Sequence, residues 1–513
     1  MSKETNEFAN KLIHFSKIGD LVEKIRSTGK KITLCHGVFD LLHPGHIRHL
    51  AKAKELGEIL IVSITADKYV NKGPGRPAFP ESLRAESLAN IISVDYVIIT
   101  PFPTAIEILD AIKPNFYVKG NDYVEASSDK TGNIAKERDI VESHGGQLFY
   151  TNEIVFSSSE LINRFIPTHS NEVSIWIKNL KSNHETAEIL EWLDRISRLK
   201  VTVIGETIID VYTECEALGK SSKDPVLCFN KGSSKSYAGG ILAIGAHANG
   251  LGADTTIVSG INYKDPDIDE IKKLRNRGIK LRSVDIAPSP TIRKERLVDS
   301  RTSARVLELY EMKDIPLTSD QDKKFIQLIS ENILDVDVII VGDYGHGLIS
   351  KEAINFISNS GKFLAVNAQT NAGNRGFNTI TRYPRMDFAT LNGIEAQLET
   401  RHRHVQIESF IERLQKTSST SQIIVTKGGD GMDIFSKNMA FCHSPALAPF
   451  VRDRVGAGDA VLTIASLLSA LNAPPEIIGF YGSICGAWAV SFVGNEKNLD
   501  IGTISRYAKS LLS

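Results

Sequence analysis

The stretch KITLCHGVFDLLHPGH occupies residues 31–46 and decides the fold of the first part of the chain. It begins with apolar and β-branched residues typical of a buried strand, and it ends in a Pro-Gly-His sequence suited to a helix start. Strand-like runs follow at 58–64, 95–99, 116–119 and 147–150, with helical segments at 44–56, 81–92, 103–112, 133–144 and 158–165. This alternation predicts an α/β domain with a parallel, Rossmann-like sheet covered by helices on both faces.

His43 and His46 stand three residues apart at the expected helix start, on neighbouring positions of one helical face. The N-terminus of a helix presents unpaired N–H groups and a partial positive charge, so it can bind phosphate. Imidazoles there can donate hydrogen bonds to a phosphate whose charge grows during displacement. Gly45 lets a nucleotide approach the backbone. Taken alone, two histidines also fit a surface helix start or half of a metal site.

The complete string from His36 to His46 resembles the HxGH signature and preceding loop of the cytidylyltransferase-like nucleotidyltransferase family. The resemblance extends over residues 25–166 and includes VKGNDY at 118–123 and three serines at 157–159. It implies transfer of a nucleotidyl group from an NTP, with Mg²⁺, to a sugar phosphate, with release of pyrophosphate. It implies His43, His46 and Lys119 as catalytic residues, Asp122 as a substrate contact, and as nucleotide contacts Gly37, Phe39, Asp40, Gly45, Arg84, Ser157, Ser158 and Ser159. Asn121 and the serines depart from the family pattern, so ATP and CTP both remain open.

A second strand–helix alternation occupies residues 198–513 and follows a predicted linker and helix at 167–197, polar up to about 183. Strands are expected at 200–205, 337–341, 363–366, 386–391 and 421–426, and core helices at 457–471 and 475–493. Residues 211–230 and 291–309 have the pattern of short strands and predict a small β lid. We therefore expect a second α/β domain.

The sequence DRVGAGDA at 453–460 leads into the first of those apolar helices. Gly-Ala-Gly at a helix start exposes N–H groups that can hold a phosphoryl group during transfer. Asp459 can accept the proton of an attacking hydroxyl. A lone GAGD also fits ordinary helix capping.

Together with Asp453, this string resembles the DTxGAGD signature of the PfkB/ribokinase sugar-kinase family. The resemblance implies Asp459 as the catalytic base and Glu395 as the residue that acts on Mg²⁺. It implies nucleotide contacts at Asn392, Glu395, Lys427, Gly429, Gly431, Gly456, Ala457 and Gly458, and substrate contacts at Asp210, Gly239, Gly240 and Asp453. Where relatives carry sugar-facing residues, this chain has 241–243 (ILA), 367–370 (NAQT) and Arg454. A changed sugar is the simplest interpretation.

The two halves together resemble the bifunctional heptose-7-phosphate kinase/heptose-1-phosphate adenylyltransferases of lipopolysaccharide precursor synthesis, with the domain order exchanged. The resemblance implies a sugar-phosphate kinase and sugar-1-phosphate nucleotidyltransferase that makes an NDP-sugar of the ADP-heptose kind, as a dimer formed through the β lid. Two alternatives stay open. One is a nucleotidyltransferase fused to an inactive kinase-like binding domain, and the other is a ligand-sensing scaffold.

The composition is that of an ordinary globular protein, with 513 residues of which 42% are hydrophobic and 24% are charged. Lys plus Arg number 60 and Asp plus Glu 61, and this balance argues against nucleic acid or an anionic membrane as a partner. The five cysteines form no CxxC pair, and the polar N-terminus does not resemble a signal peptide. We expect a cytoplasmic protein.

Overall fold

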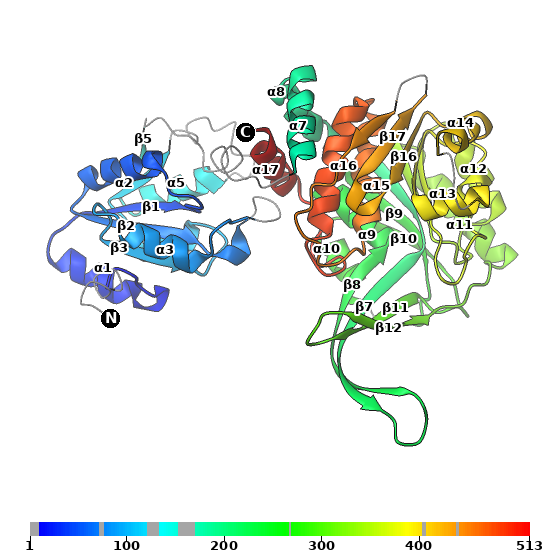
Figure 1. Cartoon of the computed structure of the whole chain (residues 1–513), viewed down its shortest axis with the longest axis horizontal. Coiled ribbons are helices and arrows are strands. Elements are labelled where there is room, and N and C mark those ends of the chain that lie inside the picture. The colour runs from blue at the N-terminus through cyan, green and yellow to red at the C-terminus, as the bar shows by residue number, and fades with distance from the viewer. Residues whose placement is uncertain are drawn as a thin grey trace. The chain divides into compact units, whose positions relative to one another are not determined.

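The computed structural model describes residues 10–70, 76–120, 133–151, 170–265, 268–402, 407–437 and 441–513. The chain divides into two compact units, residues 1–168 with 509–513 and residues 169–508. Each unit is built around its own sheet, as Figure 1 shows. The prediction of two α/β domains is confirmed.

The sheet of the first unit has five strands, and every paired strand runs parallel to its neighbours. The strand order is β3-β2-β1-β4-β5, so the chain reverses its direction of winding between β1 and β4. In open parallel sheets, ligands bind at such a switch point, beyond the carboxyl ends of the strands. The strands are β1 (Ile32–Gly37), β2 (Ile59–Thr65), β3 (Tyr96–Thr100), β4 (Phe116–Gly120) and β5 (Gln147–Thr151).

Helices cover both faces of this sheet. One buried cluster joins α1 (Ile18–Ser27), α4 (Ile106–Ile112) and α5 (Asn133–Ser143) to one face, and a second joins α2 (Pro44–Leu56) and α3 (Glu81–Ala89) to the other. Leu34 and Cys35, adjacent in β1, belong to the two different clusters, as the two-residue side-chain period of a strand requires. The helix expected at 158–165 lies outside the described residues.

The second unit contains a larger sheet of nine strands in the order β10-β9-β6-β13-β14-β15-β16-β17-β18. The pairs from β10 to β16 are parallel, and β17 and β18 continue the sheet antiparallel. The winding reverses between β6 and β13, whose carboxyl ends therefore define a second candidate binding edge. The strands are β6 (Lys200–Gly205), β9 (Asp254–Ile261), β10 (Lys280–Asp285), β13 (Val338–Asp343), β14 (Phe363–Ala368), β15 (Phe388–Asn392), β16 (Gln422–Thr426), β17 (Met432–Ser436) and β18 (Cys442–Ser444).

Two groups of helices enclose this sheet. On one face pack α11 (Ser319–Asn332), α12 (Lys351–Ser358), α13 (Gly393–Thr400) and α14 (Ile407–Thr417). The helices α9 (Ile241–Gly250), α15 (Ala457–Ala470) and α16 (Pro475–Ala489) form the second group, and α15 and α16 are the two apolar core helices expected from the sequence. The chain also forms α10 (Asp269–Asn276) and α17 (Ile501–Leu512), and the end of α17 is assigned to the first unit.

A separate four-stranded sheet forms the lid, in the order β12-β11-β7-β8. Its strands are β7 (Thr207–Lys220), β8 (Leu227–Gly240), β11 (Ile292–Asp299) and β12 (Arg305–Glu311). The β7–β8 hairpin extends away from the main sheet of its unit, as Figure 1 shows. The first residues of β7 follow almost directly on β6, which brings the lid to the carboxyl edge of the main sheet.

The segment predicted as a polar linker is helical over most of its length. Residues 171–183 form α7 (Asn171–Asn183), which is followed by α8 (Thr186–Ile196), and both belong to the second unit. Ser170 caps α7 by accepting a hydrogen bond from the Val173 N–H at 3.3 Å. Val173 and Leu180, seven residues apart, are buried. The prediction of a linker up to about residue 183 was wrong. Two buried side chains make an apolar stripe too narrow to recognise in a polar sequence.

Both of these helices pack against α16. The Trp176 ring of α7 lies 6.0 Å from the Phe480 ring, and the Tyr481 hydroxyl donates to the Ile189 carbonyl of α8 at 2.8 Å. Across the described residues, no helix is both long and apolar enough to cross a membrane.

Candidate active sites

In the first unit, the histidine pair lies where the sequence predicted it, at the start of α2 just beyond β1. His43 is the N-cap, and its Nδ1 accepts a hydrogen bond from the Gly45 N–H at 3.2 Å. The rings of His43 and His46 lie 4.0 Å apart between centroids. Phe39, held at a φ of 50° in the loop after Gly37, contacts His46 edge-on at 5.3 Å. The loop and the helix start thus present the two imidazoles together.

The capping bond fixes which nitrogen of His43 carries the proton. Because Nδ1 accepts, the neutral ring carries its hydrogen on Nε2. Burial lowers the pKa of His43, so this neutral form prevails at pH 7. Nε2 is buried and has no hydrogen-bond partner among the described residues. A buried donor without a partner is costly, and a phosphate oxygen would satisfy it.

Lys119 is the penultimate residue of β4, the strand beside β1 across the switch point. Its Nζ lies 3.0 Å from Glu137 Oε2 of α5, and the Tyr117 hydroxyl donates to the same oxygen at 3.0 Å. Burial, together with the charge of Lys119, lowers the pKa of His36 to about 3 and that of His49 to about 4. The structure therefore brings Lys119 into the electrostatic range of the histidines around the start of α2.

Two residues expected to contact the nucleotide make hydrogen bonds to the protein's own loops. The Asp40 carboxylate is buried and accepts from the Ala78 N–H at 2.7 Å and from Arg76 at 3.2 Å. The Arg84 guanidinium is also enclosed; it donates to the Val38 and Thr65 carbonyls and pairs with Asp67. Both side chains fix the loop after β1. Asp122 and the serines at 157–159 lie outside the described residues.

In the second unit, Asp459 sits in the first turn of α15. Its carboxylate is buried and accepts a hydrogen bond from the Tyr344 hydroxyl at 3.0 Å. Burial raises the pKa of Asp459 to about 7, and the negative charge of Asp210 adds to the increase. A carboxyl group with such a pKa can take up a proton near neutral pH, as a general base must.

The GAGD turn has an open approach. Gly456 is the N-cap of α15 with a φ of 85°, a conformation that favours glycine. A Cβ built on Gly458 would meet no atom within 4 Å, so the space above the first turn is empty of protein. Ala457, Gly458 and Asp459 are the first residues of α15. Their backbone N–H groups have no acceptor within the helix, as in the first turn of any α-helix. This arrangement can receive a phosphoryl group.

The predicted sugar-binding carboxylate is paired in the structure. Asp210 of β7 accepts a hydrogen bond from Arg296 of β11 at 2.5 Å, and both side chains are buried. Gly239 leaves room for this carboxylate, since a Cβ there would lie 2.2 Å from Asp210 Oδ2. Gly240 has a φ of 51° and starts α9. Lys294 is also buried, and it lies on the same face of β11 as Arg296. In the register of β11 with β7, Lys294 stands opposite Asp210.

Asp453 joins the GAGD turn to the lid. Its carboxylate accepts from the Tyr212 hydroxyl of β7 at 2.7 Å, from the Gly494 N–H at 2.9 Å and from the Val455 N–H at 3.0 Å, and it pairs with Arg305 of β12. These contacts join strands of the lid to the segments around the GAGD turn.

Glu395 is the candidate magnesium contact. It and Asn392 form a capping box at the start of α13, and its Oε1 also accepts from the Thr370 N–H at 3.2 Å. Burial raises the pKa of Glu395 to about 7. It lines a small cavity with Asn378 and Glu399. No group of three or more acidic, histidine or cysteine side chains suited to a metal occurs among the described residues. A single carboxylate fits Mg²⁺ that arrives on nucleotide phosphates.

The predicted nucleotide loop turns between β16 and β17. Lys427 pairs with Asp433, which also accepts from His443 at 2.7 Å if that nitrogen is protonated. Gly431 has a φ of 78°, and a Cβ there would lie 2.1 Å from the Ser444 carbonyl oxygen. Lys427 and Gly429 line a polar cavity whose opposite wall is the start of α7, at Ser170 and Glu172.

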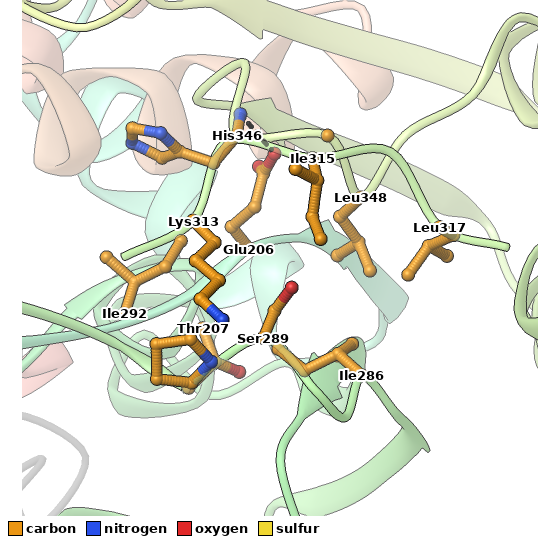
Figure 2. Close-up of a pocket in the computed structure, with 13 residues that line it drawn as sticks. Glu206, Thr207, Ile286, Ser289, Ile292, Lys313, Ile315, Leu317, His346 and Leu348 are labelled. Atoms are coloured by element: carbon orange, nitrogen blue, oxygen red, sulfur yellow. Dashed lines mark hydrogen bonds between the residues drawn. The ribbon is translucent and has the colours of Figure 1, made fainter. Parts of the chain in front are cut away.

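A further pocket lies at the carboxyl ends of β6 and β13. Figure 2 shows Glu206, Lys313 and His346 on one side and Ile286, Leu317 and Leu348 toward the other. The Glu206 carboxylate accepts from the N–H groups of Tyr344 and His346 at 3.0 and 3.1 Å. Burial, with the nearby charge of Asp343, raises the pKa of Glu206 to about 7.

Comparison with known families agrees with this arrangement. The family model of the pfkB family carbohydrate kinases matches residues 198–500. The chain belongs to this family. A cytidylyltransferase-like domain matches residues 34–164, ahead of the pfkB domain. The domain order is therefore the exchanged one expected from the sequence.

Several curated relatives of this pfkB protein are named as bifunctional. "Bifunctional protein HldE" of Syntrophotalea carbinolica is 35% identical over 150 residues, 29% of each chain, and that of Aliarcobacter butzleri is 40% identical over 136 residues, 26% of this chain and 28% of the relative. The chain thus spans less than a third of the length of these relatives. Escherichia coli phosphofructokinase-2, in complex with potassium, matches at a TM-score of 0.50 and 13% identity, over 61% of this chain and 99% of that structure. That likeness shows the fold alone.

Sequence reasoning missed several side chains that complete these sites. Glu137 neutralises Lys119, and Tyr344 contacts Asp459. Lys294 and Arg296 face inward on β11 beside Asp210. A signal for the last two was present, since alternate residues of a strand share a face and Ile292 sets the buried one.

Proposed function

We propose that the chain is a bifunctional enzyme that phosphorylates a sugar phosphate and transfers a nucleotidyl group to a sugar 1-phosphate. The observation that carries the proposal is the presence of two candidate sites in one chain: a buried imidazole donor at the start of a helix, and a buried carboxylate at a GAGD turn. The product class is an activated sugar of the ADP-heptose kind for surface glycans. The bifunctional name of the relatives supports this combination.

In the transferase reaction the nucleophile is a phosphate oxygen that is already ionised, so no strong base is needed. The sugar phosphate attacks the α-phosphorus of the NTP, the bond to the bridging oxygen breaks, and pyrophosphate leaves. His43 Nε2–H donates to an α-phosphate oxygen as its charge grows, and His46 acts beside it. Lys119 supplies a cation to the phosphates.

In the kinase reaction the nucleophile is a neutral hydroxyl, which must lose a proton. Asp459 takes that proton while the γ-phosphoryl group moves from ATP to the sugar oxygen and ADP leaves. The first turn of α15 holds the moving phosphoryl group. Asp210 and its neighbours Gly239 and Gly240 border the sugar. Mg²⁺, when bound with the nucleotide near Glu395, neutralises phosphate charge.

We propose that the chain dimerises through the lid, on the ground of the exposed apolar side chains that the lid carries. Its outer strands carry exposed apolar side chains on β12, and others lie at the tip of the β7–β8 hairpin; they are Leu218, Val226, Leu227, Val306, Leu307 and Leu309. Contiguous exposed apolar side chains mark interaction surfaces. The cytoplasmic location expected from the sequence stays a proposal.

The direct test is a screen of sugars, sugar phosphates and the four NTPs with the full-length chain, measured by ADP and pyrophosphate release. Sugar-dependent ADP and sugar-1-phosphate-dependent pyrophosphate together support both activities. Pyrophosphate without ADP, across a panel that includes heptose 7-phosphates, refutes the kinase and leaves a nucleotidyltransferase with a kinase-like binding domain. Absence of both products refutes the whole proposal.

A further inference from the structure

The only residue shown donating a side-chain hydrogen bond to Asp459, among the described residues, is Tyr344. Its hydroxyl lies 3.0 Å from Asp459 Oδ1, and both side chains are buried. Tyr344 is not part of α15; it follows β13, on the main sheet. The contact therefore ties the catalytic turn to the switch point of the sheet.

The backbone of Tyr344 is fixed from both sides. Its N–H donates to Glu206 Oε2 at 3.0 Å, and its carbonyl oxygen accepts from the Asn371 and Asn374 side-chain amides, each at 2.7 Å. Gly345 follows with a φ of 70°, and a Cβ there would lie 2.2 Å from Asn374 Nδ2. Three buried or half-buried side chains thus specify where the Tyr344 ring stands.

The asparagine pair comes directly after the 367–370 stretch, where the sequence departs from that of heptose kinases. This stretch is not loose: Asn367 donates to the Thr390 carbonyl at 2.9 Å, and the Gln369 N–H donates to the Asp343 carbonyl at 2.8 Å. A segment that had lost its role would not be expected to keep such a network. This stretch leads directly into the segment whose asparagines hold the Tyr344 carbonyl oxygen.

We infer that Tyr344 is the positioning residue of the kinase, which holds the Asp459 carboxylate in place and favours its ionised form. This inference rests on the proposed kinase function and goes beyond it. A neutral hydroxyl that donates to a carboxylate stabilises the charged form, whereas burial and neighbouring negative charge oppose it. The hydrogen bond therefore lets a buried aspartate remain available as a base.

The charged groups that act on Asp459 have opposite effects. Asp210 of β7 raises its pKa, Lys294 of β11 lowers it, and the Tyr344 hydrogen bond lowers it as well. Burial is the largest influence, and it raises the pKa. When the Tyr344 hydroxyl is removed, the positive charge of Lys294 still favours the ionised form of Asp459, but the hydrogen bond no longer does. We expect Tyr344→Phe to shift the protonation midpoint of Asp459 to higher pH.

The experiment is an infrared titration of the full-length chain. The carboxylic-acid band of Asp459 is isolated by subtracting the spectrum of Asp459→Asn, and its midpoint is compared between wild type and Tyr344→Phe. In parallel, the pH profile of kcat is recorded with a sugar phosphate that gives ADP in the screen above. We expect a higher midpoint, an acid limb moved in the same direction, and a fall in kcat of roughly tenfold with little change in KM.

Tyr481→Phe is the matched control, because it removes another buried tyrosine hydroxyl, which donates to the Ile189 carbonyl at 2.8 Å. It should lower Tm without moving the midpoint or the acid limb. If Tyr344→Phe does not fold, 3-fluorotyrosine at position 344, a stronger donor of the same shape, should move the midpoint to lower pH.

The outcomes separate the two claims. ADP formation by the wild type with an unmoved midpoint and acid limb in the Tyr344 variants refutes the role of Tyr344 alone. Absence of ADP with every sugar phosphate refutes the kinase, and the role of Tyr344 with it.

Discussion

Replacement of Asp459 by Asn should stabilise the fold while it abolishes sugar phosphorylation. Burial raises the pKa of Asp459 to about 7, against roughly 4 for an aspartate in the unfolded chain. Below the unfolded pKa the group is protonated in both states and costs nothing. As pH rises from about 4 to about 7 the folded state must keep a proton or bury a charge, and the full cost is present above pH 7.

Three pKa units correspond to roughly 4 kcal/mol, an upper bound that relaxation of the site reduces to about 1–2 kcal/mol. Asparagine has the same shape, carries no charge, and can still accept the Tyr344 hydroxyl. Its Tm should therefore exceed that of the wild type by a few degrees at pH 8, and by less at pH 5. Sugar-dependent ADP formation should fall by roughly 10² or more, and pyrophosphate release by the transferase should not change. A Tm difference that is equal at both pH values would contradict the reasoning.

The remaining predictions concern three other features of the chain. His43→Ala should reduce pyrophosphate release by on the order of 10²–10³, since it removes the Nε2 donor. His144→Ala is the control and should leave the rate unchanged, because His144 follows α5 and lies 2.8 Å from Asp110. Gly239→Ala should abolish sugar-dependent ADP formation but not ATP binding measured by calorimetry, because its Cβ would lie 2.2 Å from Asp210 Oδ2; Gly486→Ala, whose Cβ makes only an ordinary 3.4 Å contact, is the control. A fragment of residues 170–513 should have a higher Tm than one of residues 198–513, because α7 and α8 pack on α16; equal values would show that these helices add nothing.

The sequence predicted the position of a functional residue where that residue lies next to a recognisable strand or helix start. The apolar run before His36 and the histidines of α2 could be placed together because a strand, a short loop and a proline-started helix leave little freedom. The same holds for the GAGD turn and α15. In each case the functional side chain lies within a few residues of the element that positions it.

What could not be predicted depends on contacts between distant segments. The Tyr344–Asp459 bond spans 115 residues and the Arg296–Asp210 pair spans 86. Asp40 and Arg84 match a family pattern, but only the fold shows that their hydrogen bonds go to neighbouring loops. The α7 helix was missed because two buried side chains give too weak a periodic signal.

The Lys119–Glu137 pair gives substrate binding in the first unit the character of ion exchange. A phosphate that reaches Lys119 meets a cation that already has a buried counter-ion at 3.0 Å. The incoming dianion must displace this carboxylate from Lys119, because two negative charges beside one buried lysine repel each other.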